Sequence, residues 1–197
     1  MSRYSVDVFV HVMGAIAVFV GYGSLLLAVT AMRRATNSDQ VRAITSTLLA
    51  TRKIGLERIS AIDVIVIVGV FMIAITGLDM ALTFQLLRAP WVEVAIGSFL
   101  VLAPIGPLMT NPRLHRIEDA ANLETSGPIS NVLRAHTHDP LLALELGGSL
   151  GILIGLVFLM TTKPGLVVSL VAVLVAVAGG LALSWSFALR PDAATPR

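Results

Sequence analysis

Five long apolar stretches, separated by two polar segments and two short turns, organise the chain. They cover residues 4–31, 60–86, 91–111, 141–162 and 166–189. Each has about the 20 residues, or more, that an α-helix needs to cross the hydrocarbon core of a bilayer. This pattern predicts an all-α fold, a polytopic membrane bundle of five transmembrane helices that forms a single domain over residues 1–197.

The polar segment at residues 32–59 predicts a short helix outside the membrane. Val41, Ile44 and Leu48 fall on one face of such a helix, and Asn37 or Ser38 is placed to cap its start. An amphipathic helix that lies on the membrane surface is the simplest account of this spacing.

Proline and glycine mark two further boundaries. Pro104 and Pro107 remove two backbone donors from the third apolar stretch, so we expect this helix to kink or to end near Pro104. Gly127 and Pro128 divide the polar segment at residues 112–140 into two short helices.

Composition and charge fit the same architecture. The chain is 56% hydrophobic and 13% charged, whereas a soluble domain has about a quarter charged residues. Eleven of the fourteen lysines and arginines lie at residues 32–59, 112–140 and in the C-terminal tail. The positive-inside rule then predicts an outer N-terminus and a cytoplasmic C-terminus in a multi-pass protein of the cell's inner (plasma) membrane. We therefore expect the lipid bilayer, and not nucleic acid, as the surrounding partner.

Ionisable side chains within the apolar stretches are the candidate chemistry. Asp7 and His11 lie one helical turn apart near the start of the first stretch, and Asp79 lies at a similar depth in the second. Each such group costs about 2.5–3.5 kcal/mol inside a bilayer, so it usually faces protein, water or another such group. His11, Asp7 and Asp79 therefore form a candidate cofactor-binding site, in which His11 would ligate haem iron or copper and a carboxylate would orient it. Catalytic sequence patterns are absent, and so is cysteine.

Glycines at intervals of four mark the fourth stretch. Small residues at this spacing let a neighbouring helix approach closely. The fifth stretch carries a complementary set of small residues, which predicts that the two helices form a tightly packed antiparallel hairpin. The helix-packing residues of the fourth stretch are Gly147, Gly151 and Gly155.

The first helix also resembles a known group of proteins. The segment VDVFVHVMGAIAVFVGYGSLLLAVTAMRRA, with His11, Gly14-Ala15 and Gly21, is similar to the first helix of a predicted bacterial integral membrane protein family of unknown function. That family is distantly similar to copper-resistance D-type proteins and to the membrane protoporphyrinogen oxidase family. The segment at residues 74–78 resembles the threonine-glycine turn in its second helix. In the oxidase family the matching histidine is associated with haem, so the resemblance implies a haem-ligand role for His11 alone.

Three roles remain open from the sequence. The favoured one is an accessory or structural subunit that packs in the membrane, as a homo-oligomer or within a larger membrane complex. The first alternative is a haem- or copper-binding membrane protein with His11 as the ligand. The second is a small cation or proton permease that uses the acidic groups. No catalytic activity is assigned.

Overall fold

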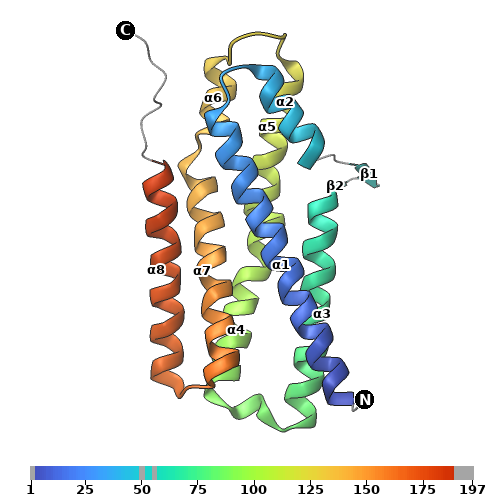
Figure 1. The fold of residues 1–197 in the computed structure, drawn as a ribbon, viewed down its shortest axis with the longest axis vertical. Coiled ribbons are helices and arrows are strands. Elements are labelled where there is room, and N and C mark those ends of the chain that lie inside the picture. Colours follow the sequence, from blue (N-terminus) through green and yellow to red (C-terminus); the bar gives the residue numbers. More distant parts are fainter. Residues whose placement is uncertain (1–2, 49–51, 55–56, 189–197) are drawn as a thin grey trace.

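The computed structural model describes residues 3–48, 52–54 and 57–188, which form a bundle of long helices with a helical cap at one end (Figure 1). The long helices are α1 (Arg3–Arg34), α3 (Ala61–Thr83), α4 (Pro90–Ile105), α7 (Pro140–Thr162) and α8 (Leu166–Ala188). The cap contains α2 (Ser38–Leu48), α5 (Asn111–Leu123) and α6 (Asn131–Thr137). A 3-10 turn, Leu86–Arg88, connects α3 to α4.

Five helical stretches in the described part of the chain are long and apolar enough to cross a membrane, which confirms the predicted number. They are Arg3–Arg34, Ala61–Thr83, Pro90–Leu123, Asn131–Thr162 and Leu166–Ser186. The first and third extend past the predicted apolar stretches because the helix continues into polar sequence, and the fourth combines α6 with α7 across the caps at His138 and Asp139. The fold is therefore that of a multi-pass helical membrane protein.

The third of these stretches rules out one of the two outcomes expected near Pro104, the end of the helix. The helix does not end near Pro104; it continues through one π-helical turn, Gly106–Thr110, directly into α5. In this turn the Asn111 N–H donates to the carbonyl oxygen of Gly106, five residues earlier. Pro107 has no N–H to offer, and a wider turn accommodates that loss without breaking the helix.

A small antiparallel pair of strands is a second difference from the sequence-based expectation. β1 (Arg52–Ile54) pairs with β2 (Glu57–Ile59) in the link between α2 and α3, with Arg52 opposite Ile59. The hydrophobic pattern predicted only helix in this region, and strands of three residues are too short to leave a period of two in the sequence.

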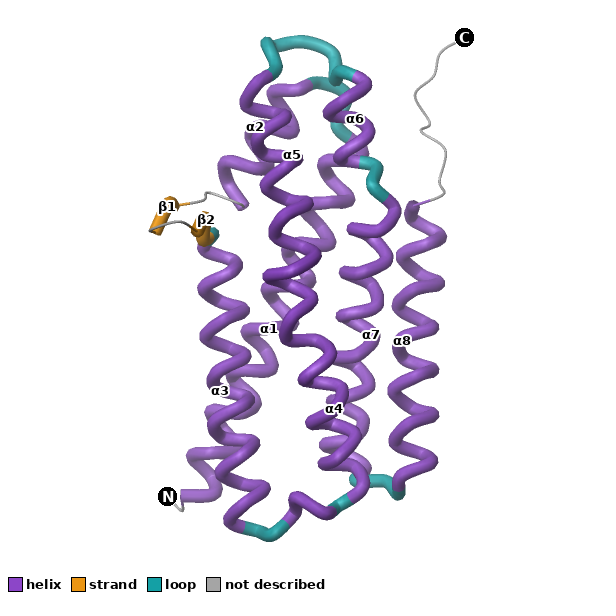
Figure 2. Tube along the Cα trace, turned by 180° about the vertical axis from the view of Figure 1, so that it is seen from behind, coloured by secondary structure: helices purple, strands orange, loops and turns teal. Residues whose placement is uncertain are grey.

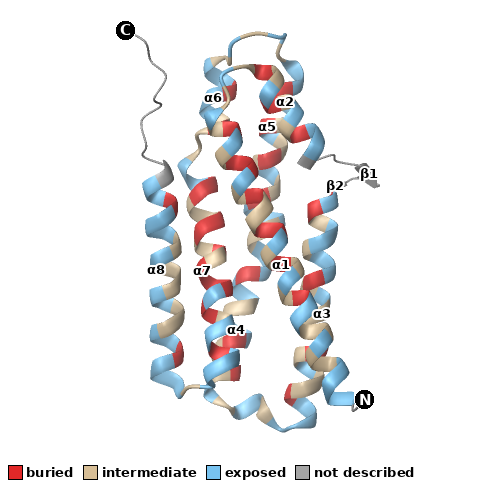
Figure 3. Ribbon diagram, in the orientation of Figure 1, coloured by how far each residue is buried: buried red, intermediate tan, exposed pale blue. Residues whose placement is uncertain are grey.

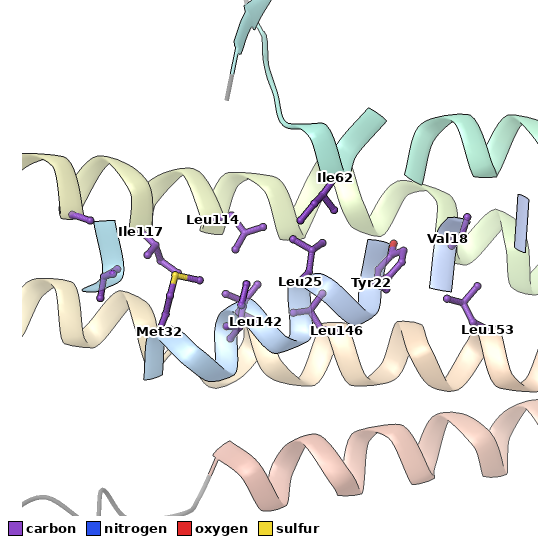
Figure 4. Packing of buried hydrophobic residues seen from close by; sticks show 14 of the residues in the cluster. Val18, Tyr22, Leu25, Met32, Ile62, Leu114, Ile117, Leu142, Leu146 and Leu153 are labelled. Carbon is purple, nitrogen blue, oxygen red and sulfur yellow. The ribbon is translucent and has the colours of Figure 1, made fainter. Parts of the chain in front are cut away.

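Helix α1 lies at the centre of the packing. It contacts α3 along one side and α7 along the other (Figures 1 and 2). Helix α7 also pairs with α8, and α4 packs on α7 and α8. Figure 3 shows buried residues concentrated on α1 and α7 and exposed residues on α3 and α8. The apolar interior runs along α1 from Val18 through Leu25 to Met32, where Leu114, Ile117, Leu142 and Leu146 contact it (Figure 4).

Two pairs of helices approach each other through glycine. A Cβ atom added at Gly14 of α1 would lie 2.8 Å from the carbonyl oxygen of Gly69 in α3, and one at Gly69 would lie equally close to that of Gly14. At Gly151 of α7 an added Cβ would lie 2.5 Å from the carbonyl oxygen of Ala176 in α8. Any side chain at these positions would push the backbones apart. Helix α8 therefore lies directly against the glycines singled out in the sequence, Gly147, Gly151 and Gly155.

The cap brings the two polar segments together. The Ser38 N–H donates to the carbonyl oxygen of Gly127 over 2.9 Å, and Asn37 forms a bridge with Pro128. The Asn37 side chain caps α2 by accepting from the Asp39 N–H. Residues far apart in the sequence thus form one polar end of the bundle.

Helix α2 contacts the rest of the protein along the side that carries Val41. Its buried residues are Ser38, Val41 and Thr45, which face α1 and α5, while Ile44 is only partly buried. Thr45 is accommodated because its hydroxyl donates to the Arg42 carbonyl oxygen in its own helix. Val41 and the partly buried Ile44, which the sequence placed on one face, both pack against the apolar interior.

Candidate functional site

His11 lies in the interface between α1 and α3. Its Nδ1 atom is 3.2 Å from Oγ1 of Thr76, and the ring also contacts the backbone of Ile73. A Cβ atom at position 77 would lie 3.1 Å from Cε1 of His11, so Gly77 gives the imidazole the room it needs. The threonine-glycine pair noted in the sequence therefore holds this histidine.

Thr76 determines which nitrogen of His11 carries the proton. The Thr76 hydroxyl donates to the carbonyl oxygen of Met72 over 2.5 Å, so its oxygen is left to accept from His11. The hydrogen-bond pattern then assigns the proton to Nδ1, and Nε2 keeps its lone pair. A neutral imidazole in this tautomer is the form that ligates metals.

The two aspartates of the candidate site meet at an arginine that the hydrophobic pattern does not single out. Nη2 of Arg3 lies 2.5 Å from Oδ1 of Asp79, and Nε of Arg3 lies 4.0 Å from Oδ2 of Asp7. Arg3 thus connects the first turn of α1 to α3 at the same end of the bundle as His11. It stands just outside the apolar stretch, where a basic residue is ordinary and gives no signal of its own.

The side chains near His11 do not form a complete metal site. Among the residues that the structure describes, no group of three or more histidine, aspartate and glutamate side chains lies close enough to hold a metal ion. His11 would therefore be the single imidazole ligand from this part of the chain at such a site.

A second polar group lies in the interior near the cap and was not part of the candidate site. Its centre is Glu145 of α7, whose side chain is only 6% exposed. Oε2 of Glu145 lies 3.0 Å from Nη1 of Arg113, and Oε1 accepts the hydroxyl proton of Thr110. Arg113 also contacts Oδ2 of Asp139 over 3.2 Å. This group joins α5, the π-helical turn and α7.

Helix α1 reaches the same region with two side chains. Nη2 of Arg33 donates to the carbonyl oxygen of Asp139 over 2.7 Å, and its Nε donates to that of Thr137 over 3.2 Å. One turn deeper on α7 than Glu145, the buried Ser149 hydroxyl lies beside the Tyr22 hydroxyl. Ser149 Oγ has no hydrogen bond of regular geometry among the described residues. With two arginines and two carboxylates, this cluster is balanced in charge.

The two polar groups are separated by close-packed apolar contacts. His11 and Tyr22 are about 16 Å apart along α1 at 1.5 Å per residue. Between them α1 buries Gly14 and Val18, and Gly14 lies directly against Gly69 of α3. Each polar group therefore belongs to its own end of the bundle.

Sequence signals for the second group existed but were ambiguous. Glu145 interrupts an apolar stretch, and Ser149 follows it at the helical spacing of four. The partner on another helix, Arg113, lies in a polar segment where arginine is common. Only the three-dimensional arrangement identifies it as the counter-ion.

Comparison with known proteins provides no further guide to function. No protein-family model, no curated protein and no solved structure matches this chain.

Proposed function

We propose that the protein is an accessory or structural subunit of the plasma membrane, with its N-terminus outside and its C-terminus in the cytoplasm. The observation that carries this proposal is the use of the intramembrane polar groups as links between helices. His11 with Thr76 and Arg3 with Asp79 join α1 to α3, and Glu145 joins α7 to α5. Polar side chains that connect transmembrane helices in this way stabilise a membrane fold.

The orientation is supported by where the basic residues gather. Both polar segments, which hold most of the lysines and arginines, meet at the cap end of the bundle (Figure 1). Positive charge favours the cytoplasmic side, so the cap is the cytoplasmic end. Its short helices would then stand on the inner surface of the membrane.

Such a subunit would meet its partner through apolar helix sides. The outward residues of α3 and α8 are exposed; Ile75 and Leu174, for example, are each 66% exposed. A photoreactive amino acid at either position should give, in native membranes, one crosslinked product of defined size with another membrane protein. The same group at the buried Leu146 serves as the control. Products that contain only lipid at both outward positions would contradict the proposal, and a crosslinked homodimer would make the partner a second copy.

A second candidate function is haem or copper binding through His11. The observation that favours it is the hydrogen bond from Nδ1 to Thr76, which leaves Nε2 as a free ligand atom. Orientation of a ligating histidine through its other nitrogen is typical of metal and haem sites. The resemblance of the first helix to haem-associated proteins points to the same residue. When bound, either group would supply one-electron redox chemistry.

Purification of the protein after expression with haem and copper distinguishes the two candidate functions. Protein made with haem and copper supplied during expression should be colourless and metal-free if His11 only links helices. A Soret band or stoichiometric copper that is lost in His11→Ala, while the protein still elutes as a folded species, would establish the binding role. In that case Thr76→Val should weaken binding, because loss of a residue that hydrogen-bonds to the ligating histidine typically lowers metal affinity by about 10–100-fold.

A further inference from the structure

The third membrane-crossing stretch is a continuous helical rod with two different sets of neighbours. It runs from Pro90 to Leu123, 34 residues or about 51 Å, which exceeds the roughly 30 Å of a hydrocarbon core. Its first half, α4, packs on α7 and α8, whereas its second half, α5, packs on α2 and α6 (Figures 1 and 2). The π-helical turn Gly106–Thr110 lies where the neighbours change.

This turn is the weakest place in the rod. Pro104 and Pro107 leave two carbonyl oxygens of the helix without their usual donors. Gly106 presents no side chain to the interior, and a Cβ atom there would lie 3.7 Å from the Tyr22 hydroxyl. Prolines and π-helical turns are the sites at which long helices bend.

Glu145 of α7 binds the end of this turn that leads into α5. Its Oε1 accepts from Thr110, the last residue of the π-helical turn, and its Oε2 pairs with Arg113 in the first turn of α5. Arg113 is also held by Asp139 at the start of α7 and by the carbonyl oxygen of Met109. A buried ion pair is not needed for stability, since well-packed apolar residues often serve as well, and its best attested role is to select one arrangement.

We propose that Gly106–Thr110 is a joint at which α5 changes its angle to α4, and that Glu145 holds this joint in the observed arrangement. Loss of the contacts with Thr110 and Arg113 weakens the hold of α7 on α5, which then rests on the ion pair between Arg113 and Asp139 at the start of α7. The segment between α6 and α7 remains bound to α1, because Arg33 of α1 donates to the carbonyl oxygens of Thr137 and Asp139 and these bonds do not involve Glu145. The moving part is therefore α5, which shifts against α2 and α6, while α2 also stays packed on α1.

The absence of cysteine allows a direct measurement on the full chain. Spin labels are introduced by Asn122→Cys on α5 and Leu183→Cys on α8, both exposed positions, and their separation is measured by pulsed dipolar spectroscopy in lipid nanodiscs. We compare the wild-type background with Glu145→Gln, which removes the charge, and with Thr110→Val, which removes the hydroxyl donor. Glu93→Gln, an exposed carboxylate on α4 of the same rod, is the matched control.

The expected result is a single distance population in the wild-type background and in Glu93→Gln. Glu145→Gln and Thr110→Val should each add a second population that is absent from the wild type. Identical distributions in all four backgrounds would overturn the proposal. If Glu145→Gln does not fold, Thr110→Val alone decides. A second pair of labels on α7 and α8 tests for general loosening, and a change there equal to that at α5 would also overturn the proposal.

Discussion

His11 Nδ1 and Thr76 Oγ1 lie 3.2 Å apart across the α1–α3 interface, although 65 positions separate the two residues in the chain. Gly14 and Gly69 bring the same two helices into contact at their backbones, one turn further in. Because the two backbones approach so closely, the side chains of His11 and Thr76 are near enough to form their hydrogen bond. The hydrogen bond and the glycine contact therefore depend on each other, and a substitution at one of them should also weaken the other.

Thr76→Val should lower the free energy of unfolding by about 0.6 kcal/mol and at most about 1.7 kcal/mol, the average and the maximum for interhelical hydrogen bonds in a membrane protein. The valine keeps the branched shape and removes the oxygen that accepts from His11. Unfolding in mixed micelles by increasing SDS measures the change. Thr83→Val, an exposed threonine of the same helix, is the control. Effects of Thr76→Val and His11→Ala that add without any coupling would show that the two side chains do not interact.

Gly151→Ala should destabilise the α7–α8 pair, whereas Gly179→Ala should leave it unchanged or slightly more stable. An added Cβ at Gly151 would lie 2.5 Å from the carbonyl oxygen of Ala176, but at Gly179 it would have no other atom within 4 Å. Alanine is otherwise favoured over glycine in a helix by about 0.5–1 kcal/mol. The same SDS titration compares the two variants. Equal tolerance would mean that the glycines of α7 face lipid.

These two predictions differ in how far the sequence alone leads to them. The intervals of four between Gly147, Gly151 and Gly155 depend only on local helix geometry, so a reader of the sequence can place them on one face. The partner of His11 depends on how α1 and α3 are aligned, which no local pattern encodes. Thr76-Gly77 was visible as a motif, but its contact with the histidine was not.

The partners in the ionic contacts could not be predicted from the local sequence either. Asp7 and Asp79 could be grouped by depth, yet Arg3, which joins them, lies in the polar N-terminal end of α1. Glu145 was visible as an interruption of an apolar stretch, but its counter-ion lies beyond a π-helical turn. Pro104 and Pro107 predicted a disturbed helix at this turn. Whether the helix ends or continues into α5 depends on its packing against neighbouring helices, which the local sequence does not reveal.

Arg113→Met should destabilise the protein more than either Thr76→Val or Gly151→Ala. It leaves the carboxylate of Glu145 buried without its cation, and removal of one partner of a buried pair costs about 3–5 kcal/mol. The double variant Arg113→Met with Glu145→Met should regain much of that loss, because both charges are gone. Thermal unfolding monitored by circular dichroism in detergent compares them. A double variant no more stable than Arg113→Met would show that the pair is not the source of the loss.

Labelling of introduced cysteines tests the proposed orientation. Leu123→Cys at the end of α5, where the native side chain is 87% exposed, should react with a membrane-impermeant maleimide only after the cytoplasmic side is opened. Leu87→Cys in the turn between α3 and α4 should react in intact cells. The reverse pattern would invert the topology, and reaction of both from one side would change the number of spans.

The length of α1 has a consequence for synthesis of the protein. Its end at the cap is bound by residues that follow much later, since Arg33 and Thr137 are 104 positions apart. At about 5–20 residues per second, the ribosome needs some 5–20 s to bring that partner out. During this interval α1 and α3 can already pair, while the side of α1 that later contacts α7 must be covered by lipid or by the insertion machinery. Biogenesis is therefore expected to proceed through an early two-helix intermediate, and nascent chains arrested before α7 should be the forms most readily degraded.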